Sequence, residues 1–93
     1  MQAGEKIVIR VEYLGLFIRL AGISGEYLTL GKGSSLEELL ETVFTRRPSL
    51  EKGNRSLFAA VNKKPITAPR AAWKEILLQD GDQVLLGVKV IGG

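Results

Sequence analysis

The sequence of 93 residues contains neither cysteine nor histidine. Without cysteine the chain can form no disulfide, no thiol nucleophile and no thiolate-ligated metal site. Without histidine it lacks the commonest general base and the commonest metal ligand of proteins. These two absences argue against self-contained hydrolysis and against a metal centre.

Long apolar runs are also missing. None is long enough to cross a bilayer, and Lys6 and Arg10 interrupt the first apolar stretch, where a secretory signal would be uniformly apolar. The hydrophobic fraction of 45% and the charged fraction of 25% are typical of a soluble globular protein. We therefore expect a single domain over residues 1–93, located in the cytoplasm and without a membrane partner.

The formal net charge is +3, and the basic residues are concentrated in the middle of the chain. Opposed there only by Glu51, they are Arg46, Arg47, Lys52, Arg55, Lys63, Lys64, Arg70 and Lys74. A charge run is most often a solvated face, and the alternative is a docking surface for an acidic protein or RNA. No stacking aromatic residues alternate with these charges, which weighs against a nucleic-acid partner.

Alternating hydrophobicity predicts a sheet of four to five strands. In residues 6–14 the apolar positions alternate with Arg10 and Glu12, as in a strand buried on one face. Similar runs predict strands at 26–30, 57–62 and 84–91, with a turn into a short edge strand at 63–67. We expect residues 15–25 to be a connection with room for a short helical turn, and residues 48–56 to be a polar loop.

One main helix is predicted after residue 35. Its apolar stripe at helical spacing comprises Leu36, Leu39, Leu40, Val43 and Phe44. Ser34 with Glu37, or Ser35 with Glu38, can form a capping box, and Pro48 ends the helix. One helix covers only one face of a sheet, so the fold class should be α+β with a mixed sheet. This order of elements is compatible with a β-grasp, in which the first and last strands are central neighbours.

Two polar motifs are better explained by turns than by ligand sites. "GKGSS" at 31–35 lacks the glycine spacing and the lysine position of a phosphate loop, which favours a hairpin followed by a helix cap. "DGD" at 80–82 has two carboxylates without further ligands, which favours a turn over a metal site.

Leu14 and Leu85 are candidate docking residues. By strand parity both lie on the sheet face away from the helix, beside charged residues. Isolated exposed leucines are common and need no function. If the first and last strands are neighbours, however, the two side chains lie close together and form an apolar docking patch, with Ile66 expected nearby.

The sequence ends in "VIGG", with Gly92 and Gly93 directly after the last predicted strand. Two terminal glycines can be a frayed end without function. Because glycine has no side chain, however, such a tail can also lie extended in a narrow channel and deliver its carboxylate to a partner's site. A free carboxylate is unreactive, so that partner would have to activate it.

"AAVN" at 59–62, "LQDGDQV" at 78–84 and "VIGG" at 90–93, in this order and spacing, resemble the MoaD/ThiS family of ubiquitin-like sulfur carriers over nearly the whole chain. "LAG" at 20–22 and "SSLEELLE" at 34–41 are most similar to MoaD, the small subunit of molybdopterin synthase. "PRAAWKEILLQDGDQVLL" at 69–86 is more similar to ThiS, the carrier for the thiamin thiazole. The long N-terminal half favours MoaD, although Gly87, Val88 and Lys89 stand where MoaD tends to have bulky aromatic and proline residues.

The resemblance implies a ubiquitin-like β-grasp fold and a division of labour with partner enzymes. A ubiquitin-activating-like adenylyltransferase of the MoeB/ThiF type would use ATP to adenylate the carboxylate of Gly93. Sulfur from the persulfide of a sulfurtransferase or cysteine desulfurase would then convert it to a thiocarboxylate. Gly92, within a tail at 91–93, would insert into the partner, and Leu14, Ile66, Leu85 and Ile91 would contact it. The chain itself would be a carrier or a non-catalytic small subunit, not an enzyme, and would bind no cofactor.

The acceptor of the sulfur is left open among three possibilities. The first is the molybdopterin synthase large subunit of the MoaE type, for molybdenum cofactor biosynthesis. The second is thiazole synthase in thiamin synthesis, or transfer-RNA thiolation. The third is a protein modifier or a plain interaction module of the ubiquitin type, whose diglycine is joined to lysines or has no function.

Overall fold

The computed structural model describes residues 4–89, which form one five-stranded mixed sheet in the order β2-β1-β5-β3-β4. The strands are β1 (Lys6–Tyr13), β2 (Gly25–Gly31), β3 (Leu57–Val61), β4 (Lys64–Pro65) and β5 (Gln83–Val88). β1 and β5 are parallel neighbours in the middle of the sheet, and the other neighbouring pairs are antiparallel. The predicted central pairing of the first and last strands is therefore confirmed.

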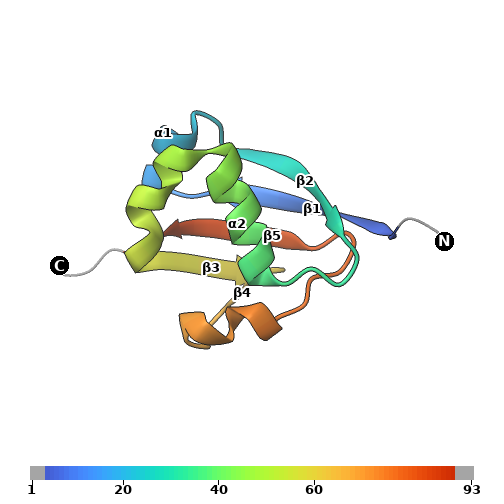
Figure 1. The fold of residues 1–93 in the computed structure, drawn as a ribbon. Helices are drawn as coiled ribbons and strands as arrows, with labels where there is room; N and C mark the ends of the chain where they lie inside the picture. Colours follow the sequence, from blue (N-terminus) through green and yellow to red (C-terminus); the bar gives the residue numbers. More distant parts are fainter. Residues whose placement is uncertain (1–3, 90–93) are drawn as a thin grey trace.

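Helix α2 (Leu36–Arg46) crosses one face of this sheet (Figure 1). The predicted apolar stripe faces the sheet, and its fully buried members are Leu36, Leu39, Leu40 and Val43. Of the two possible capping boxes, the structure forms the one between Ser35 and Glu38. The Ser35 hydroxyl oxygen accepts from the Glu38 amide at 3.1 Å, and the Glu38 carboxylate accepts from the Ser35 amide at 2.8 Å. The cap fixes where the helix starts and therefore which side chains it buries.

The core lies between α2 and the inner face of the sheet. The alternation predicted for β1 is confirmed, since Ile7, Ile9, Val11 and Tyr13 are all buried. A short helix, α1 (Leu16–Ala21), closes one end of the core and buries Phe17. Gly22, in the left-handed conformation with φ of 81°, ends α1 and donates its amide to the Ile18 carbonyl.

Residues 48–56 differ from the predicted polar loop. They form a 3₁₀ segment, η1 (Pro48–Ser56), that buries Leu50 and Gly53. Gly53 packs so closely that a Cβ atom there would lie 2.6 Å from Phe17 Cε1 and 2.7 Å from Val88 Cγ2. This contact could not be predicted from the polar composition, because most side chains of the segment are partly or fully exposed.

A second 3₁₀ segment, η2 (Arg70–Glu75), lies beside β3 and β4 and was not indicated by the sequence patterns. It places Trp73 in the core, where the indole Nε1 donates to the Ala68 carbonyl at 3.0 Å.

The motif at 80–82 is the predicted turn: Gly81 has φ of 89°, and the Asp82 carboxylate accepts from the Gln79 amide at 2.8 Å. No cluster of three or more metal-ligating side chains occurs within residues 4–89. Nor does this part of the chain contain a helix of the length and apolarity that a membrane crossing requires.

Candidate functional site

Leu14 and Leu85 lie on the outer face of the sheet, the face that α2 leaves uncovered. Leu85 pairs with Glu12 of β1 and with Ala60 of β3, and it alternates with the buried Val84 and Leu86. The Leu14 amide donates to the Leu86 carbonyl at 2.9 Å. The two leucines therefore belong to adjacent strands and share one face, as strand parity predicted.

Gly87 allows Leu14 to lie flat on this face. A Cβ atom at Gly87 would be 3.1 Å from Leu14 Cβ, so the leucine side chain covers the glycine. Phe58 pairs with Gly87 from the other side and is half-buried. We call Leu14, Phe58, Leu85 and Gly87 the outer patch.

Helix α1 extends the apolar surface beyond the outer patch. Leu14 is 39% exposed, and on the following helix Leu16 is 49% and Ile18 39% exposed. Exposed large apolar side chains indicate an interaction site when they adjoin one another and a sheet face. Leu16 and Ile18 thus add exposed apolar side chains at the end of the sheet where Leu14 lies.

The chain leaves the folded domain at the same end. Because β1 and β5 are parallel, β5 finishes where Leu14 and α1 lie, and the last described residue, Lys89, donates its amide to the Ser56 carbonyl at 2.6 Å. We call Lys89 the tail root. The predicted site residues Ile91, Gly92 and Gly93 lie outside the described residues. Four residues extend at most about 14 Å, so Gly93 stays within that distance of the tail root.

Ile66 does not join the outer patch. Pro65 pairs with Ala60, whereas the Ile66 amide donates to the Ala59 carbonyl at 2.9 Å. Ile66 consequently points to the opposite side of the sheet and packs against the core. It lines a separate hollow at the edge of β3.

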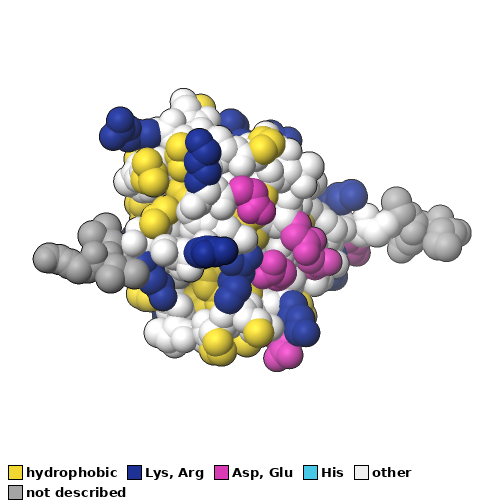
Figure 2. All heavy atoms as spheres, turned by 60° about the vertical axis from the view of Figure 1, so that its left-hand side comes forward, with side chains coloured by type: hydrophobic (Ala, Val, Ile, Leu, Met, Phe, Trp, Pro, Cys, Tyr) yellow, Lys and Arg dark blue, Asp and Glu magenta, His cyan; other side chains and the backbone are white. Residues whose placement is uncertain are grey.

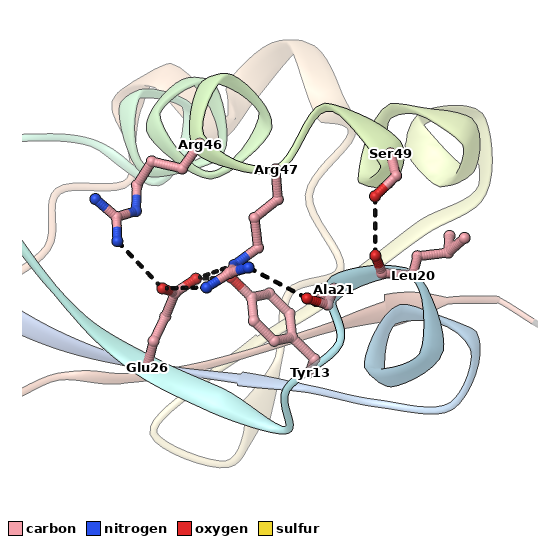
Figure 3. A network of polar contacts seen from close by, with 7 residues as sticks. All are labelled: Tyr13, Leu20, Ala21, Glu26, Arg46, Arg47 and Ser49. Atoms are coloured by element: carbon pink, nitrogen blue, oxygen red, sulfur yellow. Dashed lines mark hydrogen bonds and ion pairs between the residues drawn. The ribbon is translucent and has the colours of Figure 1, made fainter.

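A polar network holds α1 and the end of α2 on the sheet (Figure 3). Arg47 binds Glu26 through two bonds, Nε to Oε2 at 2.7 Å and Nη2 to Oε1 at 3.0 Å, and its Nη1 donates to the Ala21 carbonyl at 3.2 Å. The Tyr13 hydroxyl donates to Glu26 from β1, and Arg46 Nη2 adds a contact at 3.4 Å. One carboxylate therefore joins β1, β2 and α2, while Arg47 also binds the end of α1.

The network changes the acid–base properties of its members. Hydrogen bonds from Arg47 lower the pKa of Glu26 to about 2, against the opposing effect of burial and with a further contribution from Tyr13. Burial, together with the hydrogen bond to Glu26, raises the pKa of the Tyr13 hydroxyl well above its usual range. The Glu26 side chain is 11% exposed and that of Arg47 is 25% exposed. These shifts are what a structural ion pair produces and supply no general base at neutral pH.

The model of the ThiS family matches residues 11–93, most of the sequence and all of its C-terminal half. The chain belongs to the ThiS family. No curated protein matches the sequence. Membership confirms the resemblance to the MoaD/ThiS family drawn from the AAVN, LQDGDQV and VIGG motifs.

Solved structures similar to this ThiS-family chain have the same fold. A protein described as molybdopterin converting factor subunit 1 from Pyrococcus furiosus has 23% identity and a TM-score of 0.76, covering 90% of this chain and 99% of its own. Small archaeal modifier protein 1 from Methanosarcina acetivorans has 21% identity and a TM-score of 0.75, covering 97% and 100%. A complex of subunits 1 and 2 of molybdopterin-converting factor from Helicobacter pylori gives 21% identity, a TM-score of 0.63, and coverage of 94% and 100%. The predicted ubiquitin-like β-grasp is confirmed.

Several residues at this end of the molecule were not singled out from the sequence. Leu16 and Ile18 fell within the segment expected to be a connection, and a six-residue helix is too short for its periodicity to be distinctive. Phe58 belonged to a predicted strand, but its face could be assigned only once its pairing with Gly87 was known. Arg55 was one of many basic residues, and its position near Lys89 depends on the hydrogen bond from the Lys89 amide to Ser56, the last residue of η1.

Proposed function

We propose that this chain is a sulfur carrier for molybdopterin synthesis, with the carboxylate of Gly93 as the carrying group. The observation that carries the proposal is the ThiS-family match, which runs through the diglycine to Gly93. The chemistry would belong to partner enzymes, and the folded domain would present its tail to them.

The proposed reaction begins when the Gly93 carboxylate attacks the α-phosphorus of ATP on a ubiquitin-activating-like enzyme. Pyrophosphate leaves and an acyl adenylate forms. A persulfide sulfur from a sulfurtransferase or cysteine desulfurase then attacks the carbonyl carbon and displaces AMP, and a thiol cleaves the resulting sulfur–sulfur bond. The product is a thiocarboxylate, a nucleophilic sulfur that the molybdopterin synthase large subunit would accept.

The outer patch and α1 would serve as the handle in this reaction. A partner that holds Gly93 within about 14 Å of Lys89 also lies close to Leu14 and α1, because these share one end of the sheet. Apolar contact there would supply binding energy remote from the reacting carbon, and that energy can be used to orient the tail.

Deletion of Gly93, or addition of one alanine after it, tests the proposal. Each change moves the carboxylate by roughly 3.5 Å, and errors of that size at a reacting centre cost orders of magnitude in rate. The measurement is intact mass after incubation with ATP, a sulfur source and the activating enzyme. The wild type should gain the mass difference between sulfur and oxygen, and both variants should not, while their circular dichroism stays native-like. A comparable gain by the deletion variant would show that Gly93 does not carry the sulfur.

The acceptor can be identified with the thiocarboxylate form of the chain. Incubation with a molybdopterin synthase large subunit should discharge the sulfur, and incubation with a thiazole synthase should not. Discharge by thiazole synthase alone would mean that the chain supplies sulfur for thiamin synthesis instead.

A role as a protein modifier is the second candidate, and the structural likeness to small archaeal modifier proteins favours it. In that case the acyl adenylate would pass to a lysine amine rather than to sulfur. Tryptic digestion of proteins from cells that express the chain would then release lysines bearing a Val-Ile-Gly-Gly remnant, because Lys89 is the last basic residue before Gly93, and this remnant would disappear when Gly93 is deleted.

A further inference from the structure

A hollow of about 670 Å³ lies beside the tail root, at the edge of β3. We call it the edge hollow. Leu57, Ile66 and Trp73 supply its apolar lining, and Arg55, Arg70 and Lys89 supply its cationic side chains. Figure 2 shows dark-blue Lys and Arg side chains beside yellow apolar surface on the face that carries the end of β5. Phe58 belongs to both the edge hollow and the outer patch, whereas Ile66 points to the other side of the sheet and lines only the hollow.

The described residues that line the edge hollow give it a positive charge. None of its lining residues is acidic. The charge of Arg70 is paired with Glu37, since its Nε lies 3.0 Å from Glu37 Oε1, and its Nη1 also donates to Asn54 Oδ1 at 2.7 Å. Arg55 and Lys89 form no ion pair with any residue between 4 and 89. A ligand that fits these two side chains carries negative charge.

Within residues 4–89, no strand lies beside the part of β3 that borders the hollow. β4 pairs only with Ala60 and Val61. The Ala59 carbonyl accepts from Ile66 on the open side of β3, while the Ser56 carbonyl accepts from Lys89 on the β5 side. By this alternation the main-chain groups of Leu57 point to the open side, where an extended peptide can add to the strand.

We propose that the edge hollow receives an extended acidic segment, with one apolar side chain, of the enzyme that adenylates the tail. Carboxylates of the segment would bind Arg55 and Lys89, its apolar side chain would contact Ile66 and Trp73, and its backbone would pair with Leu57. The inference rests on the proposed function, because Lys89 lies four residues before Gly93 and an enzyme that holds Gly93 must lie beside the hollow. A peptide fits better than a compact anion because the positive charge, the apolar lining and the open strand edge are contiguous.

Two variants test the charge and the shape of the hollow separately. Arg55→Glu reverses a charge on an exposed side chain, and Thr67→Trp fills the hollow from an exposed position in its lining. The matched control is Lys6→Glu, which makes the same charge change at the opposite end of β1. The dissociation constant of each full-length variant for the cognate activating enzyme is measured at low and high salt, together with thiocarboxylate formation and the melting temperature.

We expect Arg55→Glu and Thr67→Trp each to weaken binding about tenfold at low salt, while Lys6→Glu changes it less than about twofold. The effect of Arg55→Glu should shrink at high salt, because salt screens the charge, and the effect of Thr67→Trp should remain. All three variants should melt within a few degrees of the wild type. Thiocarboxylate formation by Arg55→Glu at limiting chain concentration should fall in proportion to affinity and recover at saturation.

The outcomes separate this inference from the proposed function. Thiocarboxylate formation by the wild type, with unchanged affinity of both hollow variants, would overturn the inference and leave the carrier role intact. Binding of the wild type without any gain of sulfur would overturn the carrier role. Saturable shifts of the Leu57 amide and Trp73 indole resonances by ATP alone would overturn the peptide assignment in favour of a nucleotide. A dimer that Arg55→Glu dissociates would overturn it in favour of a second copy of this chain.

Discussion

The carboxylate of Glu26 should make the stability of this fold sensitive to acid, and Glu26→Gln should remove that sensitivity. Glu26 accepts hydrogen bonds from Arg47 and Tyr13 and is 11% exposed (Figure 3). Its pKa is about 2 in the folded chain and 4.5 as an ordinary glutamate, so the folded state favours the charged form. This contribution to stability is complete above about pH 4.5 and is lost as the pH falls through about 2.

The magnitude follows from the two pKa values. A difference of one pKa unit corresponds to about 1.4 kcal/mol, so the charged form of Glu26 is stabilised by about 3 kcal/mol on folding. Glutamine keeps one oxygen acceptor, and solvent reaches the Arg47 side chain, which is 25% exposed. The variant therefore retains part of this stabilisation. We expect Glu26→Gln to lower the free energy of unfolding at pH 7 by about 2–3 kcal/mol, or about 10–20 °C in melting temperature.

Urea unfolding at pH 7, 4.5, 3 and 2 measures this effect for the wild type and the variant. The difference between them should be largest at pH 7 and should approach zero below about pH 2, where the carboxylate becomes protonated in the folded state as well. The control is Glu12→Gln, because Glu12 makes only a 3.6 Å contact with Arg10 on the sheet surface. It should change stability by less than about 0.5 kcal/mol at every pH. A loss below about 1 kcal/mol at pH 7, or a constant difference down to pH 2, would refute the reasoning.

Two further substitutions test the docking role of Leu14 and the close packing of Gly53. Leu14→Asp should weaken binding to the activating enzyme about tenfold or more with little change in melting temperature, whereas Leu77→Asp, at a leucine that is 63% exposed outside the apolar surface, should alter neither. Unchanged affinity for the activating enzyme would show that Leu14 does not contact it. A large fall in melting temperature would show that Leu14 belongs to the core. Gly53→Ala should cost about 1–3 kcal/mol by calorimetry, because its Cβ would overlap Phe17. Gly31→Ala, whose Cβ would meet nothing closer than 4.0 Å, should cost much less, and equal costs would contradict the packing argument.

The elements that could be predicted from the sequence are those whose signal is local. In β1 every second residue is apolar, and this alternation alone assigns Ile9 and Val11 to the buried face. In α2 the apolar stripe, the serine cap and Pro48 agree on both ends of the helix. The 3₁₀ segment η1 lacks such a signal, because Leu50 and Gly53 are buried by contacts with distant parts of the chain.

The candidate site could be predicted only where strand parity and pairing agree. Leu14 and Leu85 were assigned to one face because the parity of both strands is clear and the strands are neighbours. Ile66 was expected with them but lies on the other side, since a shift of one position along β4 reverses the face. The register that decides this is set by the turn at Asn62 and Lys63, which both have positive φ, and the sequence pattern does not fix it. The roles of Gly92 and Gly93 remain predictions, because these residues lie outside the described part of the chain.

Stability and binding are separable at the outer patch, but they are coupled at α1. A helix of six residues is not stable alone, so Leu16 and Ile18 are held in place by the contacts of α1 with its surroundings. Buried Phe17 is one such contact, and the others are hydrogen bonds from Arg47 to the Ala21 carbonyl and from Ser49 to the Leu20 carbonyl at 2.9 Å. Glu26 orients Arg47 for the first of these bonds. A substitution at Glu26 therefore loosens an apolar surface that Glu26 does not touch, so Glu26→Gln should weaken binding of the activating enzyme even at temperatures where the chain remains folded.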